Sequence, residues 1–199
     1  MKKETILFDI DGTLIDSVSM AEMFRKKIAQ IIKISVDEIK ELSDKYIATL
    51  KSRTDFHPFD LIKFINKTKN QTIDSNDIFF KSKNIYKKYI YNDVVTNLDK
   101  LKNNYNLGVF SEGFRDYQGQ KIATLIDKFD KNLLFITRRK LDNEFLKQIP
   151  KETLIIDDKQ EVVETLKQFR PDLELVWINR DGKEKIKEVR TIKSLDELI

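Results

Sequence analysis

TILFDIDGT, at residues 5–13, joins a short apolar run to two carboxylates, Asp9 and Asp11, that are separated by a single residue. The apolar run is typical of a buried β-strand, and the glycine after the second carboxylate indicates a turn. Alternate residues of a strand share a face, so a bend after the strand lets both carboxylates point into one crevice. Close carboxylates repel, and they stay together when a cation neutralises them or when they divide the work of nucleophile and acid. A plain acidic turn has the same local sequence, so the rest of the chain must decide between the two.

The composition is that of a globular protein with a highly charged surface. Of the 199 residues, 40% are hydrophobic and 35% are charged, and only five are glycine and three proline, which argues against disorder. The absence of cysteine excludes disulfides and thiolate chemistry. No apolar run is long enough for a signal peptide or a membrane span. We therefore expect a soluble cytoplasmic protein without a membrane partner.

Positive charge is spread along the chain rather than concentrated. The formal net charge is +4, and the densest clusters are at residues 25–27, 87–88 and 138–140. Acidic residues alternate with the basic ones, so mixed charge on solvated helix faces accounts for most of the excess. The charge pattern does not favour nucleic acid as the primary partner.

Apolar segments and helical patterns alternate through most of the chain, and this order predicts an α/β fold with a doubly wound parallel sheet. Helical spacing precedes the second segment and follows the second and fourth. The members of these three helical patterns are Val94, Leu98 and Leu101; Ile122, Leu125, Ile126 and Phe129; and Val162, Leu166 and Phe169. The predicted strands are Thr5 to Asp9, Leu107 to Ser111, Leu133 to Thr137, Thr153 to Asp157 and Leu173 to Ile178.

Polar residues occur where several of these strands end. Right-handed crossovers place the carboxyl ends of parallel strands at one edge of a sheet. Asp9, Ser111, Asp157 and Asp158 all occupy such ends. Several polar residues at one edge favour a functional site over an isolated acidic turn.

The interval between Asp16 and about Asn92 breaks the alternation, because it contains helical patterns but no convincing strand. We expect four helices here, with a capping box at residues 35–38, Pro58 in the first turn of the third helix, and the fourth helix running from about residue 74 to about residue 91. The predicted domains are therefore a core at residues 1–15 and 93–199 and a helical insertion at residues 16–92. A lid that closes over the sheet edge and a layer packed permanently on the core both fit this pattern.

Taken together, the motifs resemble those of the haloacid dehalogenase superfamily over the whole chain. Residues 9–14 (DIDGTL) are similar to its first motif, DxDGT. Residues 108–111 (GVFS) resemble its second motif, an apolar strand ending in Ser or Thr. Residues 140–145 (KLDNEF) resemble the third, a lysine that begins a helix, and residues 154–158 (LIIDD) the fourth, an apolar strand ending in acidic residues.

The resemblance implies a Rossmann-like parallel sheet of about five strands in the order 3-2-1-4-5, with a helical cap inserted between the first two motifs. It also implies phosphoryl transfer through an aspartyl-phosphate with bound Mg²⁺. In this reading Asp9 is the nucleophile, and Asp11 protonates the leaving oxygen and then activates water. Mg²⁺, which prefers hard oxygen ligands, would be held by Asp9, Asp158 and the backbone carbonyl of Asp11, with Asp157 as the alternative direct ligand.

The same resemblance implies a phosphate site at Ser111, the backbone amides around Glu112, and Lys140. Arg139 is the alternative to Lys140 as the phosphate cation. Ser111 has a simpler alternative role, that of a helix cap.

Two residues depart from the family pattern. Val162 stands four positions after the metal carboxylate, where an acidic residue or Asn is frequent, and Glu161 is adjacent to it. Glu112 stands where Asn is frequent and brings a negative charge toward the phosphate.

Further candidate residues lie outside the four motifs. We expect three of them near the edge of the site: Gly113, Arg115 and Gln118. His57, the single histidine, is a candidate substrate contact, together with its neighbours Arg53, Lys51 and Phe56.

The function that we expect is a Mg²⁺-dependent phosphatase acting on a small phosphorylated metabolite. A phosphomutase would use the same intermediate, and a catalytically weak protein that keeps the fold to bind a partner is a further alternative. A dehalogenase is disfavoured, because it needs neither an acid at Asp11 nor a metal. The sequence is compatible with a monomer and with a homodimer.

Overall fold

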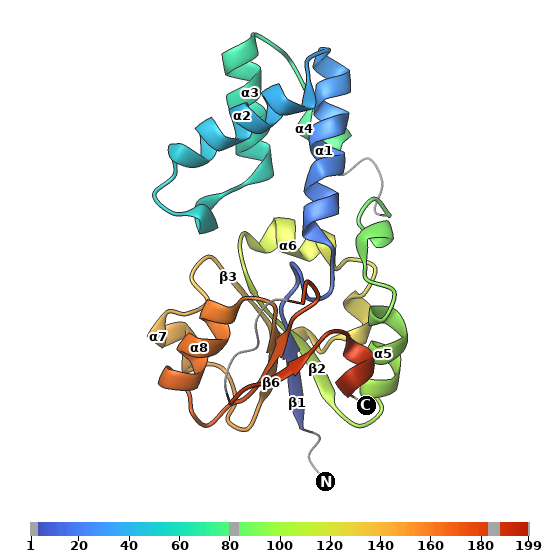
Figure 1. Cartoon of the computed structure of the whole chain (residues 1–199), viewed down its shortest axis with the longest axis vertical. Coiled ribbons are helices and arrows are strands. Elements are labelled where there is room, and N and C mark those ends of the chain that lie inside the picture. The colour runs from blue at the N-terminus through green and yellow to red at the C-terminus, as the bar shows by residue number, and fades with distance from the viewer. Residues whose placement is uncertain (1–3, 80–83, 183–187, 199) are drawn as a thin grey trace.

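Six parallel strands form one sheet in the order β3-β2-β1-β4-β5-β6. The computed structural model describes residues 4–79, 84–182 and 188–198. Figure 1 shows the sheet as the lower part of the molecule, with helices on both faces. The strands are β1 (Thr5–Phe8), β2 (Asn106–Glu112), β3 (Leu134–Thr137), β4 (Leu154–Asp157), β5 (Glu174–Ile178) and β6 (Arg190–Ile192).

The first strand lies at the centre because its residues are apolar on both faces. β1 pairs with β2 on one side, where Leu7 is level with Gly108, and with β4 on the other, where Leu7 is level with Ile155. Ile6 and Phe8 pack into the larger hydrophobic cluster, whereas Leu7 packs into a second cluster with Phe110 and Ile155. A strand that is covered on both faces reads as a continuous apolar run, which is why β1 could be predicted.

The α/β fold and the order of the first five strands are as predicted, and β6 is an addition. β6 has three residues and pairs in parallel with β5. A segment this short carries too few alternating positions to stand out in the sequence. It extends the sheet beyond β5 and leaves the central strands unchanged.

Four helices pack around the sheet: α5 (Val94–Leu101), α6 (Arg115–Lys121), α7 (Asn143–Leu146) and α8 (Gln160–Phe169). The prediction of a helix through Ile122 and Phe129 is wrong. The helix after β2 ends at Lys121, and residues 122–129 form turns and a 3₁₀ segment, Ile126–Lys128. The apolar residues Ile122, Leu125 and Phe129 are buried all the same, so the spacing reflected core contacts without a regular helix.

Helices α1 (Ser17–Ile32), α2 (Val36–Ala48), α3 (Pro58–Lys69) and α4 (Ser75–Phe79) lie between β1 and β2 in the chain. They form a separate helical lobe (residues 17–79) above the carboxyl ends of the strands (Figure 1). Ser35 accepts a hydrogen bond from the amide of Glu38, the first half of the predicted capping box, and Pro58 occupies the first turn of α3. The division of the chain into domains at residues 15/16 and 92/93 stays a prediction.

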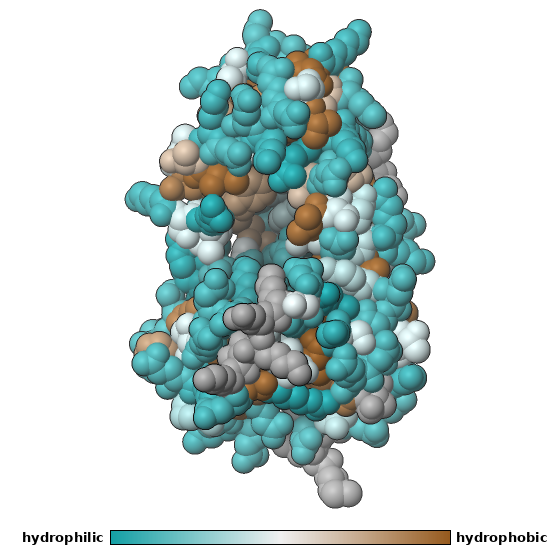
Figure 2. All heavy atoms as spheres, in the orientation of Figure 1, coloured by the Kyte–Doolittle hydropathy of each residue, from teal (hydrophilic) through white to brown (hydrophobic). Residues whose placement is uncertain are grey.

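The fourth helix of the lobe is shorter than predicted. α4 ends at Phe79, residues 80–83 lie outside the described residues, and a 3₁₀ segment, Lys87–Tyr89, follows. Within residues 4–79, 84–182 and 188–198, the helices are too short or too polar to cross a membrane. On the face shown in Figure 2, the surface is hollowed between the lobe and the core, with hydrophobic side chains gathered along the hollow.

Candidate active site

The turn after β1 buries Asp9 at the carboxyl edge of the sheet. Its amide donates to the carbonyl of Ile156 in β4 at 2.9 Å, which continues the strand pairing by one residue. The chain then turns at Gly12, whose φ is +75°. A Cβ at Gly12 would lie 2.2 Å from the Oδ2 atom of Asp158. The glycine is therefore required both by the left-handed conformation and by the approach of this second carboxylate.

Lys140 is completely buried between two carboxylates. Its Nζ atom lies 2.5 Å from Asp157 Oδ2 and 3.2 Å from Asp9 Oδ1. Burial alone would lower the pKa of Lys140, but the charges of Asp157 and Asp9 outweigh it and raise the pKa. The lysine is therefore a fixed positive charge beside Asp9.

Asp9, Asp157 and Asp158 form an acidic cluster in which one oxygen of each lies within 4.8 Å of the others. Burial, together with the neighbouring carboxylates, raises the pKa of Asp9 to about 6 and that of Asp158 to about 7. The Oδ1 atom of Asp158 is buried without a hydrogen-bond partner among the described residues. Three carboxylates facing one lysine leave excess negative charge, so this cluster fits a divalent cation.

Two contacts of the neighbouring segments hold the cluster in place. The indole Nε1 of Trp177 in β5 donates to the backbone carbonyl of Asp158 at 2.9 Å. The amide of Lys159 donates to Asp157 Oδ1 at 3.0 Å. Trp177 is buried, and it also fixes the backbone of Asp158. Asp157 is not merely an acidic residue at the start of α8, because it also pairs with Lys140.

Asp11 lies outside the acidic cluster and is held by α6. The Nζ atom of Lys121 is 2.6 Å from Asp11 Oδ2 and 2.7 Å from Asp11 Oδ1, and the side-chain amide of Gln118 donates to Oδ2 at 3.1 Å. Burial alone would raise the pKa of Asp11, but the charge of Lys121 and these hydrogen bonds prevail and lower it. These contacts therefore orient the Asp11 carboxylate and favour its ionised form over its protonated form.

Gln118 connects Asp11 to the end of β2. Its Nε2 atom also lies 3.1 Å from the hydroxyl oxygen of Ser111 and 2.9 Å from the carbonyl of Glu112. Ser111 is buried and does not cap α6, which begins after Phe114. The structure thus brings Ser111, Glu112 and Gln118 beside Asp11. The amide of Gly113 donates to the carbonyl of Thr137 at 2.8 Å and is already occupied.

Lys121 is the residue that the sequence reasoning missed. It lies three positions after Gln118, and residues with that spacing share one face of a helix. Its side chain is 5% exposed, and its ammonium lies 4.5 Å from the centre of the Tyr117 ring. The signal in the sequence was a lysine at helical spacing from a polar residue already expected at the edge of the site.

Arg139 points away from the carboxylates and toward the helical lobe. Its guanidinium donates to both carboxylate oxygens of Asp55, at 3.0 and 3.2 Å, and to the hydroxyl of Thr54. His57 makes a second contact between lobe and core, with its Nε2 atom 3.3 Å from Asp116 Oδ2. Of the two candidates for the phosphate cation, the structure therefore places Lys140, and not Arg139, beside Asp9.

Val162, one of the two residues that depart from the family pattern, belongs to the hydrophobic core. Val162 is buried in the hydrophobic cluster that contains Leu7 and Phe110. Glu161 is exposed, so it does not replace an acidic side chain at Val162. The Lys159 amide holds the carboxylate of Asp157, and the Trp177 indole holds the backbone carbonyl of Asp158.

A cavity of about 190 Å³ opens onto Asp11 between the core and the helical lobe. Core residues on its wall include Glu112, Tyr117, Lys121 and the exposed Lys159. The segment between α2 and α3 contributes the rest of the wall: Arg53, Thr54 and Phe56. A substrate in this cavity would touch the helical lobe and Asp11 together.

Comparison with known proteins places this chain among hydrolases. The family model described as haloacid dehalogenase-like hydrolase matches residues 3–170. No curated protein matches the chain.

Three solved structures share the fold over nearly the whole of both chains. A HAD phosphatase from Thermococcus onnurineus is 23% identical, with a TM-score of 0.69 over 98% of this chain and 95% of that one. The HAD-hydrolase YfnB from Bacillus subtilis, bound to magnesium, is 16% identical, with a TM-score of 0.66 over 100% and 97%. The L-2-haloacid dehalogenase from Xanthobacter autotrophicus is 16% identical, with a TM-score of 0.59 over 99% and 97%.

Proposed function

The chain belongs to the haloacid dehalogenase-like hydrolase family, and from that premise we propose that this hydrolase is a Mg²⁺-dependent phosphatase of a small phosphorylated metabolite. The observation that carries the proposal is the acidic cluster beside Lys140. Asp9, Asp157 and Asp158 share one site, and Asp158 Oδ1 has no partner among the described residues. That donor set matches the oxygen ligands that Mg²⁺ prefers.

The proposed reaction has two steps. A carboxylate oxygen of Asp9 forms a bond to phosphorus, the ester P–O bond breaks, and the leaving oxygen takes a proton from Asp11. Asp11 then takes a proton from water, the water oxygen bonds to phosphorus, and the bond from phosphorus to Asp9 breaks to release inorganic phosphate. Positioned acid–base help of this kind is worth roughly 10²–10⁴-fold in rate.

Lys140 and Ser111 are the proposed partners of the phosphoryl oxygens. Lys140 supplies a fixed positive charge against an anionic substrate and an anionic nucleophile. When bound among Asp9, Asp157 and Asp158, Mg²⁺ would supply further positive charge to the phosphoryl oxygens.

The dehalogenases among the structural neighbours make halide displacement the alternative to exclude. Displacing halide from a haloacid needs neither a proton donor nor a cation. This chain has Asp11 two residues after Asp9 and an acidic cluster fit for a metal. Both features favour phosphoryl transfer.

The test uses the purified protein with Mg²⁺ and p-nitrophenyl phosphate. We expect hydrolysis that is abolished by Asp9→Asn and by EDTA and is restored by Mg²⁺ after chelation. Activity that survives Asp9→Asn would refute the proposal, as would release of chloride from 2-chloropropionate without phosphatase activity. Incorporation of ¹⁸O from labelled water into the released phosphate separates hydrolysis from transfer back to substrate, the phosphomutase alternative.

A further inference from the structure

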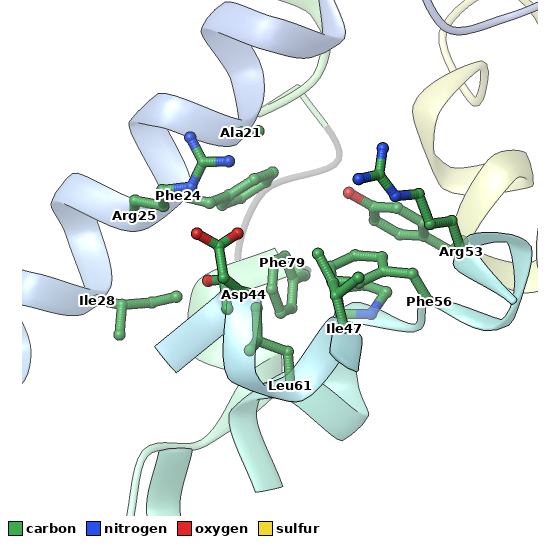
Figure 3. A pocket seen from close by; sticks show the side chains of 13 residues that line it. Ala21, Phe24, Arg25, Ile28, Asp44, Ile47, Arg53, Phe56, Leu61 and Phe79 are labelled. Atoms are coloured by element: carbon green, nitrogen blue, oxygen red, sulfur yellow. The ribbon is translucent and has the colours of Figure 1, made fainter. Parts of the chain in front are cut away.

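The helical lobe contains an apolar cavity that the reaction steps above do not use. Its volume is about 470 Å³, within the range of small-molecule sites. Figure 3 shows the aromatic rings of Phe24, Phe56 and Phe79 around it, with Arg25 and Asp44 on one side and Arg53 on the other. The wall is formed by Ala21, Phe24, Arg25, Ile28, Ser43, Asp44, Ile47, Arg53, Phe56, Pro58, Leu61, Phe79 and Tyr117.

The buried part of this wall offers almost no hydrogen bonds. Five of its six buried residues, among them Phe24 and Leu61, are apolar. The sixth, Ser43, already donates its hydroxyl to the carbonyl of Ile39 at 2.8 Å. Three charged residues also line the cavity: Asp44 and Arg53 are exposed, and Arg25 is half-buried.

Tyr117 adds a second neutral polar group to the wall, where this cavity meets the cavity at Asp11. Burial raises the pKa of its phenol well above the ordinary value, so it stays protonated and offers a single hydroxyl. Its ring packs edge-on against Phe79, with the ring centres 6.3 Å apart. The buried wall of the cavity therefore presents apolar surface and few groups that could bind a hydroxyl.

This apolar cavity adjoins the cavity of about 190 Å³ at Asp11, called here the catalytic cavity. Arg53, Phe56 and Tyr117 line both of them. The catalytic cavity contains Asp11 and Lys121. A substrate whose leaving oxygen lies at Asp11 can thus extend past Phe56 and Tyr117 into the apolar cavity.

We infer that this apolar cavity receives the leaving group of the substrate, and that the substrate is the phosphate monoester of an apolar alcohol. The inference rests on the proposed function, and it narrows the substrate class. A sugar or glycerol leaving group would lose its hydration here and find few partners. Each buried hydroxyl without a partner weakens binding by roughly tenfold or more.

The first experiment compares esters whose leaving alcohols differ in size but not in intrinsic reactivity. With the full chain and Mg²⁺, kcat/KM is measured for ethyl, butyl and hexyl phosphate. We expect it to rise by roughly fourfold per methylene, the transfer value for a buried CH₂ group. Propyl phosphate is expected to exceed glycerol 3-phosphate, which has the same number of carbons, by at least about tenfold. A flat series, or a preference for glycerol 3-phosphate, would overturn the inference and leave the phosphatase proposal standing.

The second experiment fills the cavity from its wall. Ala21 in α1 is half-buried and lines the cavity, whereas Ala48 at the end of α2 is exposed. Ala21→Phe is expected to reduce the ratio of kcat/KM for hexyl over ethyl phosphate by at least about tenfold, and Ala48→Phe to leave it unchanged. Circular dichroism and thermal unfolding check that both variants fold. An equal ratio in folded Ala21→Phe and wild type would contradict the assignment.

A binding measurement separates the two proposals. Hexan-1-ol, the product alcohol without phosphate, is titrated into the protein and followed by ligand-observed NMR. We expect binding that Ala21→Phe removes and Ala48→Phe retains. If no phosphate ester is hydrolysed but hexanol still binds in this pattern, the phosphatase proposal fails and the cavity stands as an apolar site. Hydrolysis of esters without hexanol binding would overturn the cavity assignment alone.

Discussion

The ammonium of Lys121 lies 2.6 and 2.7 Å from the two carboxylate oxygens of Asp11. This pair joins a helix after β2 to the turn after β1, and the side chain of Lys121 is 5% exposed. A proton donor must carry a proton, yet Lys121 lowers the pKa of Asp11. In the proposed reaction, Lys121 would therefore set the pH range in which Asp11 protonates the leaving group.

Lys121→Met tests that role. Without the lysine charge, burial raises the pKa of Asp11, so the protonated acid should persist to higher pH. We expect the basic limb of the pH profile of kcat/KM for ethyl phosphate, a poor leaving group, to move to higher pH. The basic limb of the kcat/KM profile for p-nitrophenyl phosphate should move less, because its leaving group needs little protonation.

Lys128→Met is the matched control for this prediction. Lys128 forms a comparable ion pair with Asp99 at 2.8 Å, and neither residue belongs to the described site. Its removal should leave both pH profiles in place. A basic limb that is unmoved in Lys121→Met, or that moves equally in both variants, would refute the assignment.

Lys140→Met should destabilise the fold strongly. Asp9 and Asp157 would be left buried without their cation, and breaking such a pair costs about 3–5 kcal/mol. The measurement is urea unfolding at pH 8 without metal, with Lys147→Met as control, since Lys147 pairs with Glu144 on the exposed surface. The loss should be smaller at pH 5, because Asp9, with its pKa of about 6, then takes up a proton. A loss no larger than that of Lys147→Met would show that Lys140 is not essential to the cluster.

Arg139→Gln separates a role in holding the lobe from a role in binding phosphate. Arg139 pairs with Asp55, and a partly exposed pair is worth about 0.2–1 kcal/mol. We expect KM to rise up to about fivefold in Arg139→Gln and in Asp55→Asn, with the double variant no worse than either one. Lys63→Gln, which breaks a pair within α3, is the control. A hundredfold loss in Arg139→Gln beside a harmless Asp55→Asn would instead identify Arg139 as a phosphate ligand.

The metal-free protein should lose stability as the pH rises. The pKa of Asp158 is about 7 in the folded state and 3.8 in its ordinary state. Between these values the folded state binds more protons than the unfolded one, so the free energy of unfolding falls from pH 4 to pH 7. One unit of pKa shift corresponds to about 1.4 kcal/mol, or roughly 3–5 °C in Tm for a chain of this size.

Thermal unfolding in EDTA across this range measures the effect. Asp158→Asn should flatten the pH dependence. Added Mg²⁺ should raise Tm more at pH 8 than at pH 5, because protons compete with the cation for the same carboxylates. A Tm that increases steadily from pH 4 to pH 8 in EDTA would contradict this prediction.

The core could be predicted from the sequence because its strands are buried on both faces. Continuous apolar runs such as residues 5–8 and 154–156 are typical of strands that helices cover on both sides. β6 and the end of α4 could not be predicted, since short elements depend on tertiary contacts more than on local pattern. Ile122 and Phe129 show the same limit, because buried residues at helical spacing line turns as well as helices.

The candidate site could be predicted where its residues stand at the carboxyl ends of strands. Asp9, Ser111 and Asp157 follow from the topology, since parallel strands bring their carboxyl ends together. The direction of a long side chain does not follow from topology. Lys140 and Arg139 are adjacent in the chain, yet one is buried beside Asp9 and the other contacts Asp55. The spacing of Lys121 from Gln118 places both on one face of α6, but the contact of Lys121 with Asp11 also depends on how α6 is oriented against the sheet.

Trp177 is the single tryptophan of the chain, and its indole is hydrogen-bonded to the backbone of Asp158. Its intrinsic fluorescence comes from one place in the molecule, next to the acidic cluster. The protein therefore carries a built-in optical reporter, and cation binding can be followed without a label, a substrate or turnover.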